Sequence, residues 1–295
     1  MITSDFTGNF GNHIFQYAAL RSIAEKKGYD WGFTKYIYGD YFGGQPQMDF
    51  LDLDYGKQPV DGIIHQYDET IVRIRHIDEV AIHQYDSFEN LQDNSKLFGC
   101  WQSEQYFEKE KVKEWFKIKN IENYINLRTD EETCVINVRG GVEYRSCPST
   151  LLLPLSYWNN AVAQMRNINP QMKFIVITDD VPYAQSLFPN FPCYHTGINT
   201  DYFVINQANY LIISNSSFAW FPAYLNERAQ MIIAPKYWAR YNVSDGYWAS
   251  SNIFTKGWMY INREGRIQSY DEVFKELRNS RYAEFYNLGI KYGSL

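Results

Sequence analysis

The chain contains TCVINVRGG at residues 133–141, KFIVITDD at 173–180, YLIISNSS at 210–217 and QMIIA at 230–234. Each run is short, rich in β-branched residues and bounded by polar residues or glycine, a pattern typical of buried strands. The segments between the runs are long enough to form helices. The second half is therefore expected to be a doubly wound α/β domain built on a parallel sheet.

The ends of several helices in this half are marked by cap residues. Ser156 is placed to cap a helix that reaches Ile168, and Ser216 or Ser217 to cap another that reaches Leu225. A last amphipathic stretch at residues 273–277 is expected to fold back across the molecule.

The first half has a weaker pattern. It opens with a short strand at residues 2–3 and a helix at 12–27 that Gly28 ends. Residues 29–100 contain only short strand candidates, at 62–65 and 80–83. A helix at 103–118, capped by Ser103, and a polar linker at 120–132 follow.

A chain of 295 residues exceeds the size at which one hydrophobic core usually keeps growing. We therefore expect two domains, residues 1–125 and residues 126–295.

Composition and charge exclude several classes of protein. The net charge is −6 and no Lys/Arg-rich run is present, so we expect no nucleic-acid partner. Four distant cysteines, the residues at positions 100, 134, 147 and 193, lack disulfide or zinc spacing and are interpreted as reduced thiols. The sequence has no run of eighteen apolar residues and no basic, then apolar, start. We therefore expect a cytoplasmic protein without a transmembrane segment.

Polar residues follow the strand at 133–138, where an open parallel sheet binds its ligands. Asn137 lies near the end of the strand, and Arg139 and Glu143 lie in the loop after it. A guanidinium there would bind a pyrophosphate bidentately and neutralise a departing nucleoside diphosphate. A salt bridge between Arg139 and Glu143 within the loop explains the same residues equally well.

Two acidic residues, Asp179 and Asp180, follow the strand at 173–178, and Pro182 is placed to open the next helix. Asp180 fits the cap of that helix. Alternatively, one of the two carboxylates accepts hydrogen bonds from a guanine edge or a ribose hydroxyl.

Hydroxyl and amide groups join the strand at 210–214 to the following helix, in the sequence Asn215, Ser216, Ser217 and Phe218. Such groups at a helix N-terminus form a phosphate site that needs no metal. Capping alone explains one serine of this cluster.

A glycine-rich turn, with Gly8 and Gly11 before Asn12, precedes the first helix and allows close approach of an oxygen-rich ligand. Ordinary turn chemistry explains it as well.

Metal sites have little support in the sequence. The only Asp-x-Asp match is Asp52-Leu53-Asp54, which is typical of a solvated turn, and no His pair has ligand spacing on one helix face. We therefore expect neither an essential metal nor another cofactor.

Five segments, taken in order, resemble the α-1,2-fucosyltransferases. Residues 8–18, GNFGNHIFQYA, resemble the family's G-G-x-G-N-Q-x-F-Q-Y-A, and residues 99–107, GCWQSEQYF, resemble G-x-x-Q-S-x-x-Y-F. Residues 153–158, LPLSYW, are similar to L-P-x-x-Y-Y, and residues 174–180, FIVITDD, to F-x-x-F-S-D-D. Residues 201–225 resemble D-x-x-L-M-S-x-C-x-x-x-I-x-A-N-S-S-F-S-W-W-x-A-W-L.

This resemblance implies a GT-B fold of two facing Rossmann-like domains, with residues 1–125 on the acceptor side and residues 126–295 binding the donor. It also implies inverting, metal-independent transfer of L-fucose from GDP-L-fucose to a galactoside hydroxyl in an α-1,2 linkage, in glycan or surface polysaccharide synthesis. The acceptor would be an oligosaccharide or a lipid-linked glycan, and the latter would bring the protein to a membrane surface as a peripheral protein.

By the same likeness, Arg139 contacts the β-phosphate, and Ser216 and Ser217 line the phosphate pocket. Asp179, Asp180 or Asp201 lies near the nucleoside, and Asp201 is the residue we favour for guanine.

One motif departs from the family. Its H-x-R-R-G-D corresponds here to NVRGGV at residues 137–142, which keeps Arg139 and loses the histidine, the second arginine and the aspartate. Glu143 and Arg145 are candidates to replace the missing carboxylate and cation, and Glu143 is the candidate base. The change leaves two alternatives open: a transferase of the same fold with another GDP-sugar, and a non-catalytic glycan- or nucleotide-binding protein.

Overall fold

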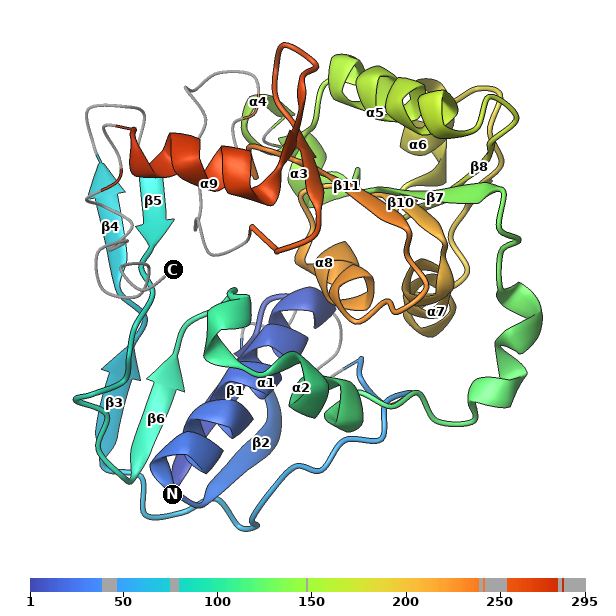
Figure 1. Ribbon diagram of the computed structural model, residues 1–295. Coiled ribbons are helices and arrows are strands. Elements are labelled where there is room, and N and C mark those ends of the chain that lie inside the picture. Colours follow the sequence, from blue (N-terminus) through green and yellow to red (C-terminus); the bar gives the residue numbers. More distant parts are fainter. Residues whose placement is uncertain are drawn as a thin grey trace.

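The computed structural model describes residues 1–38, 47–74, 80–146, 148–238, 241, 254–280 and 283. It has two main sheets, one from each half of the chain, with helices α1 (Phe10–Lys27) and α8 (Ser217–Tyr224) between them (Figure 1). The two halves therefore meet near the amino ends of these helices and the carboxyl end of the first strand.

The first half is built on a four-stranded parallel sheet with the order β2-β1-β6-β3. Its elements, besides α1, are β1 (Ile2–Thr7), β2 (Trp31–Tyr38), β3 (His65–Asp68), the hairpin of β4 (Ile71–Ile74) and β5 (Val80–His83), β6 (Ser95–Phe98), the 3-10 turn η1 (Glu104–Tyr106) and α2 (Lys109–Trp115). Sequence analysis recognised none of β2, β4 and β6. The strand expected at 62–65 was misplaced, since β3 begins only at residue 65, whereas the one expected at 80–83 is β5. The helix expected at 103–118 was right only in part: Ser103 does cap its start, but η1 and α2 are separate.

The second half is built on a seven-stranded sheet with the order β13-β12-β11-β10-β7-β8-β9, parallel except between β12 and β13. Its strands are β7 (Thr133–Val138), β8 (Lys173–Thr178), β9 (Cys193–Tyr194), β10 (Tyr210–Ile212), β11 (Met231–Pro235), β12 (Met259–Ile261) and β13 (Ile267–Ser269). Its other helices are α3 (Val142–Ser146), α4 (Pro148–Leu151), α5 (Leu155–Ile168), α6 (Val181–Leu187), α7 (Ile198–Gln207) and α9 (Tyr270–Arg278). The structure thus confirms the predicted α/β class with two parallel sheets.

Alternating side chains of the central strands enter two different cores. Val135 of β7 and Ile177 of β8 pack with residues of α7 and α8, whereas Ile136 and Val176 pack with residues of α5 and α6. Because successive side chains of a strand point to opposite faces, this division means that helices cover both faces of the large sheet. Figure 1 shows α5 and α6 on one face and α7 and α8 on the other.

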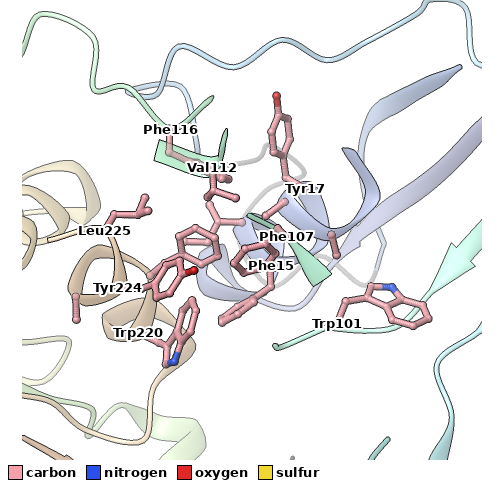
Figure 2. Close-up of a cluster of buried hydrophobic side chains, with 14 of the residues drawn as sticks. Phe15, Tyr17, Trp101, Phe107, Val112, Phe116, Trp220, Tyr224 and Leu225 are labelled. Carbon is pink, nitrogen blue, oxygen red and sulfur yellow. The ribbon is translucent and has the colours of Figure 1, made fainter. Parts of the chain in front are cut away.

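An aromatic cluster joins the two halves. The Phe15 ring of α1 lies 4.7 Å from Trp220 and 5.0 Å from Phe221 of α8, measured between ring centroids. Phe107 lies 5.6 Å from Phe221, and Figure 2 shows Phe107 beside Phe15. The buried side chains of α9 join the same cluster. A large apolar contact of this kind opposes independent motion of the halves. The 3-10 turns η2 (Ile121–Asn123) and η3 (Ile125–Leu127) lie in the expected linker, and the domain division at residues 125/126 stays a prediction.

The helix ends test the expected caps. Gly28 ends α1 with a left-handed φ of 70° as expected. Ser156 is not a cap, because α5 begins one residue before it and Pro154 occupies the cap position. Ser216 does precede α8, but its side chain makes no capping hydrogen bond.

The cysteines that the structure describes, at positions 100, 134 and 193, are free, and Cys147 lies outside the described residues. Among the helices in the described ranges, none combines the length and the apolar character needed to cross a membrane.

Candidate active site

The strand order of the large sheet changes direction between β7 and β10. From β7 the chain adds β8 and β9 on one side, and β10 and β11 then lie on the other side. The segments that follow β7 and β10 leave toward opposite faces of the sheet, and an open α/β sheet binds its ligands in the crevice that this divergence creates. Arg139 follows β7, and the Ser214–Ser217 segment follows β10, so both predicted phosphate-binding segments lie at this point.

Hydrogen bonds fix the two segments to each other. Ser214 Oγ donates to Asn137 Oδ1 at 2.7 Å, and the Asn137 Nδ2 group donates to the Ile177 carbonyl at 3.3 Å. The Tyr144 hydroxyl donates to the Asn215 carbonyl at 2.8 Å. The two buried bonds of Asn137 give it a positioning role between β7, β8 and the segment after β10, and its contact with a donor stays a prediction.

Arg139 lies between two carboxylates. Its Nη1 is paired with Asp179, and its Nη2 lies 2.8 Å from Glu143 Oε2. The loop ion pair that sequence analysis gave as one alternative is therefore present. The guanidinium carbon also lies 5.3 Å from the centroid of the Tyr144 ring, so the position of Arg139 is set from three sides.

The Asp179 carboxylate holds the loop after β7 in place. It accepts hydrogen bonds from the amides of Gly140 at 2.9 Å and Gly141 at 3.0 Å. A Cβ at Gly141 would lie 2.4 Å from Asp179 Oδ2, so the close approach of this loop requires glycine there. Gly140 stands where the family has its second arginine, and Gly141 matches the family's own glycine; the amides of both serve this turn.

Asp180 has the capping role that sequence analysis proposed. Its Oδ1 accepts the Tyr183 amide at 3.0 Å at the start of α6, and its Oδ2 is paired with Arg145 Nη2 at 2.8 Å. Pro182 stands at the opening of α6 as expected. Arg145, a candidate replacement for the missing cation, is therefore engaged by Asp180, and a donor contact of Asp180 stays a prediction.

The amino ends of α1 and α8 meet beside Arg139. Ser217 Oγ donates to Asn12 Oδ1 at 3.1 Å, and Gln102 Nε2 donates to the same oxygen at 2.7 Å. A Cβ at Gly11 would lie 2.4 Å from the Phe218 amide nitrogen, so only glycine allows this approach. The glycine-rich turn after β1 and the serine cluster after β10 are thus brought together.

Exposure separates the members of the serine cluster. Ser214, Asn215 and Ser216 are buried, whereas Ser217 and Phe218 are half-buried. The Asn215 Nδ2 group donates to the carbonyls of Leu151 and Trp238. Ser217 and Phe218 are therefore the members with partial exposure to solvent, and the donor contacts of Asn215, Ser216, Ser217 and Phe218 stay predictions.

Asp201 lies apart from this cluster, in the first turn of α7 after β9. Its buried carboxylate accepts the Thr196 hydroxyl at 2.8 Å, the Thr196 amide at 3.2 Å and His195 Nδ1 at 3.0 Å. Asp201 is thus placed to orient the loop between β9 and α7. This loop lies at the same edge of the sheet as the loop after β7, with β8 between the two strands. Recognition of guanine by Asp201 stays a prediction.

Three residues that sequence analysis did not assign complete the site. Asn9 Nδ2 donates to Glu143 Oε1 at 2.8 Å across the two halves, and Gln102 and Tyr144 make the bonds given above. Asn9 and Gln102 lie inside the motifs at residues 8–18 and 99–107, so these motifs could have identified them as site residues. Tyr144 adjoins Glu143 but belongs to no motif.

Two groups beside the site, the buried His13 and the half-buried Tyr144, are neutral at pH 7. Burial lowers the pKa of His13 to about 4, against the opposing effect of its hydrogen bond to the Gly8 carbonyl. The neutral ring donates from Nε2 to that carbonyl at 2.8 Å. Burial also raises the pKa of Tyr144 to about 12. At neutral pH, His13 therefore adds no positive charge beside the site.

In the described part of the chain, no three His, Cys, Asp or Glu side chains gather closely enough to hold a metal ion. At the Asp-x-Asp match, Asp54 Oδ1 accepts the Gly56 amide at 2.9 Å, as in a turn.

Comparison with known proteins adds a family and several relatives. The family model described as Glycosyl transferase family 11 matches residues 65–262. The O-antigen biosynthesis glycosyltransferase WbnK of Escherichia coli is 28% identical over 95 residues, which cover 30% of this chain and about a third (32%) of WbnK. The alpha-1,2-colitosyltransferase of Escherichia coli is 24% identical over 268 residues, covering 81% of this chain and 92% of that protein.

Similar solved structures include two fucosyltransferases. The NodZ alpha-1,6-fucosyltransferase soaked with GDP-fucose is 11% identical, with a TM-score of 0.44 over 78% of this chain and 93% of NodZ. POFUT1 in complex with GDP-fucose is 8% identical, with a TM-score of 0.44 over 79% of this chain and 96% of POFUT1.

Proposed function

The chain belongs to glycosyltransferase family 11, and on that premise we propose that it transfers L-fucose from GDP-L-fucose to a galactoside hydroxyl, in an α-1,2 linkage and with inversion. The observation that carries this proposal is a chain of contacts at the switch point of the large sheet: Ser217 bonds Asn12 at the start of α1, and Asn9, the cap residue of the same helix, bonds Glu143, which pairs with Arg139. An arginine and a helix N-terminus directed at one crevice suit a diphosphate.

The donor is proposed to bind by exchange of ionic partners at Arg139. Glu143 is about half exposed, with 52% of its side chain accessible, whereas Asp179 is tied to two backbone amides. An incoming diphosphate would therefore displace Glu143 and leave Asp179 in place. The guanidinium would then lie against the phosphates, with Ser217 and the first amides of α8 on the other side.

The proposed reaction is a single displacement. The acceptor oxygen bonds to C1 of the sugar while the bond from C1 to the GDP oxygen breaks, and GDP leaves with the electron pair. Arg139 would stabilise the charge that develops on the leaving phosphate. The proton of the acceptor hydroxyl would pass to Glu143, which the exchange at Arg139 releases beside Asn9. The guanidinium and the α8 amides supply the positive charge, so the proposal includes neither a metal nor another cofactor.

A direct assay tests this proposal. The purified chain is incubated with GDP-fucose, EDTA and a panel of galactosides that includes lactose, and GDP release is measured. We expect GDP release that depends on the acceptor and persists in EDTA, with an α-1,2 linkage in the product. Absence of acceptor-dependent GDP release across the panel would contradict it. Lipid-linked galactosides form a second arm, since the proposed acceptor is an oligosaccharide or a lipid-linked glycan.

A second candidate donor has its own support. The loop after β7 lacks the family's second arginine and its aspartate, and one relative is a colitosyltransferase rather than a fucosyltransferase. The alternative is a transferase that uses another GDP-sugar at the same site. Thermal stabilisation by GDP is expected under both proposals, and the GDP-sugar that is turned over chooses between them.

A further inference from the structure

A cavity of about 680 Å³ lies at the other end of α8, away from Arg139. The first half contributes η1 and the start of α2, and the second half contributes the end of α8, the start of β11, the segment before β12 and the start of α9. Six of its side chains carry the argument below: Glu104, Lys109, Tyr224, Lys256, Trp258 and Tyr270.

This cavity is separate from the candidate active site. Met231 begins β11 and Trp258 immediately precedes β12, so the cavity lies at the amino edge of the large sheet, whereas Arg139 lies at the carboxyl edge. Ser217 and Tyr224 stand at opposite ends of α8, and their Cα atoms are separated by about 10 Å along the helix axis. One helix thus connects the two sites.

The aromatic walls of the cavity are held in place by other rings. Tyr224 stacks on Trp220 with 4.6 Å between ring centroids, and Trp258 lies 6.0 Å from Trp220. Tyr270 stacks on Phe274 at 5.4 Å. Lys109 Nζ also lies 5.0 Å from the Tyr224 ring centroid, and Tyr224 and Trp258 are buried, so the half-buried Tyr270 is the most exposed of the three rings. An aromatic ring with a polar edge suits a ligand that has both apolar C–H faces and hydroxyl groups.

The polar groups of the cavity suit a ligand rich in hydroxyl groups, because hydroxyls can both donate and accept hydrogen bonds. The carbonyl end of α8 points toward it and carries the negative end of the helix dipole. The Glu104 carboxylate accepts a hydrogen bond from the Lys256 backbone amide, and the charges of Lys109 and Lys256 act on it. Burial nevertheless raises the pKa of Glu104 to about 7. A carboxylate short of water gains when sugar hydroxyls donate to it.

We propose that this cavity is a second carbohydrate site, which binds a neutral oligosaccharide segment independently of the nucleotide site. Such a site would keep a glycan chain on the enzyme without taking part in the transfer step.

The test measures oligosaccharide binding by the full chain without a nucleotide. The probes are lactose, maltotriose and cellotriose. Their binding is measured by saturation-transfer NMR and by tryptophan fluorescence, for which Trp258 is the reporter in the cavity. We expect saturable binding of at least one probe. Glu104→Gln and Tyr270→Ala should each weaken it by about tenfold, the factor that one hydrogen bond to a charged group is worth.

Two further variants separate this site from the proposed active site. Glu110→Gln makes the same substitution on the exposed face of α2 and should leave binding unchanged. Arg139→Ala should also leave oligosaccharide binding unchanged, while GDP should still stabilise Glu104→Gln. Lack of binding by all three probes, binding that both cavity variants retain, or binding that Arg139→Ala abolishes would each overturn the proposal.

Discussion

Ser217 Oγ of α8 donates a 3.1 Å hydrogen bond to Asn12 Oδ1 of α1, which joins the serine cluster of one half to the glycine-rich turn of the other. Both groups stand at the amino ends of their helices, next to the ion pair of Arg139 and Glu143. The relationship explains why two motifs separated by about two hundred residues belong to one site.

The approach of α1 to α8 depends on Gly11. In Gly11→Ala the new Cβ would lie 2.5 Å or less from Phe218 N and Ser217 Oγ, so the helices must separate. We expect a loss of about 1–3 kcal/mol in the free energy of unfolding, measured by urea titration, together with weaker binding of GDP. Gly11 lies inside α1 and has no left-handed φ, so backbone strain does not contribute to this loss. A Gly11→Ala variant as stable as the wild type would refute the steric account.

Glu143 is expected to affect turnover and donor affinity in opposite directions. Glu143→Gln removes the proposed base and also removes a competitor for Arg139. We expect kcat to fall by about 100-fold or more, while calorimetry shows GDP affinity unchanged or higher. The control is Glu132→Gln, an exposed carboxylate at the start of β7. A variant with wild-type kcat would exclude Glu143 as the base.

Glu104 should make stability fall as pH rises. Its pKa is about 7 in the folded protein because of burial, against 4.5 in a model peptide. The folded state therefore binds the proton of Glu104 more tightly than the unfolded chain does. The stabilisation that this gives is complete below pH 4.5 and is lost as the pH rises through 7. The full loss is about 3 kcal/mol. Chemical denaturation of the wild type and of Glu104→Gln between pH 4.5 and 8 measures the difference, which should shrink toward low pH.

His13 should act in the opposite direction. Its pKa is lowered by burial to about 4, against 6.5 in a model peptide. Its contribution to stability is complete above pH 6.5 and is lost as pH falls through 4, by about 3 kcal/mol in total. In His13→Gln the new side-chain amide can still donate to the Gly8 carbonyl. The α-1,2-fucosyltransferase motif that residues 8–18 resemble has glutamine at this position. The variant should fold, and its free energy of unfolding should no longer show this loss at acid pH. An unchanged loss of stability at acid pH would contradict this role of His13.

Strongly patterned strands were predictable, and weakly patterned ones were not. The bounds of β7 and β8 were right to the residue, because buried parallel strands are continuous β-branched runs. The strand β2, WGFTKYIY, mixes aromatic, glycine and charged residues and has no such run. Likewise, serine is a residue type favoured at helix caps, but α5 already begins at Leu155, so Ser156 lies inside the helix. Tertiary packing, which the local sequence does not show, sets this start.

For the site, the sequence indicated which segments matter but not how their side chains pair. Residues at strand ends could be grouped near one sheet edge, because alternating strands and helices predict parallel strands, whose carboxyl ends share that edge. The pairing of Arg139 with Asp179 joins residues 40 positions apart, and that of Asn9 with Glu143 crosses between the two halves. Neither spacing nor composition specifies such contacts. The cavity at Glu104 was likewise invisible, since its lining comes from five separate segments.

The central claim is that Arg139 and the amino end of α8 bind one diphosphate. The most direct test is calorimetric titration of GDP, in EDTA, into the wild type, Arg139→Ala, Ser217→Ala and the control Arg266→Ala, which removes an exposed arginine paired with Glu272. We predict that affinity falls by about 30-fold without the Arg139 guanidinium and by several-fold without the Ser217 hydroxyl, with no change in the control. Equal GDP affinity in the wild type and Arg139→Ala would contradict the account.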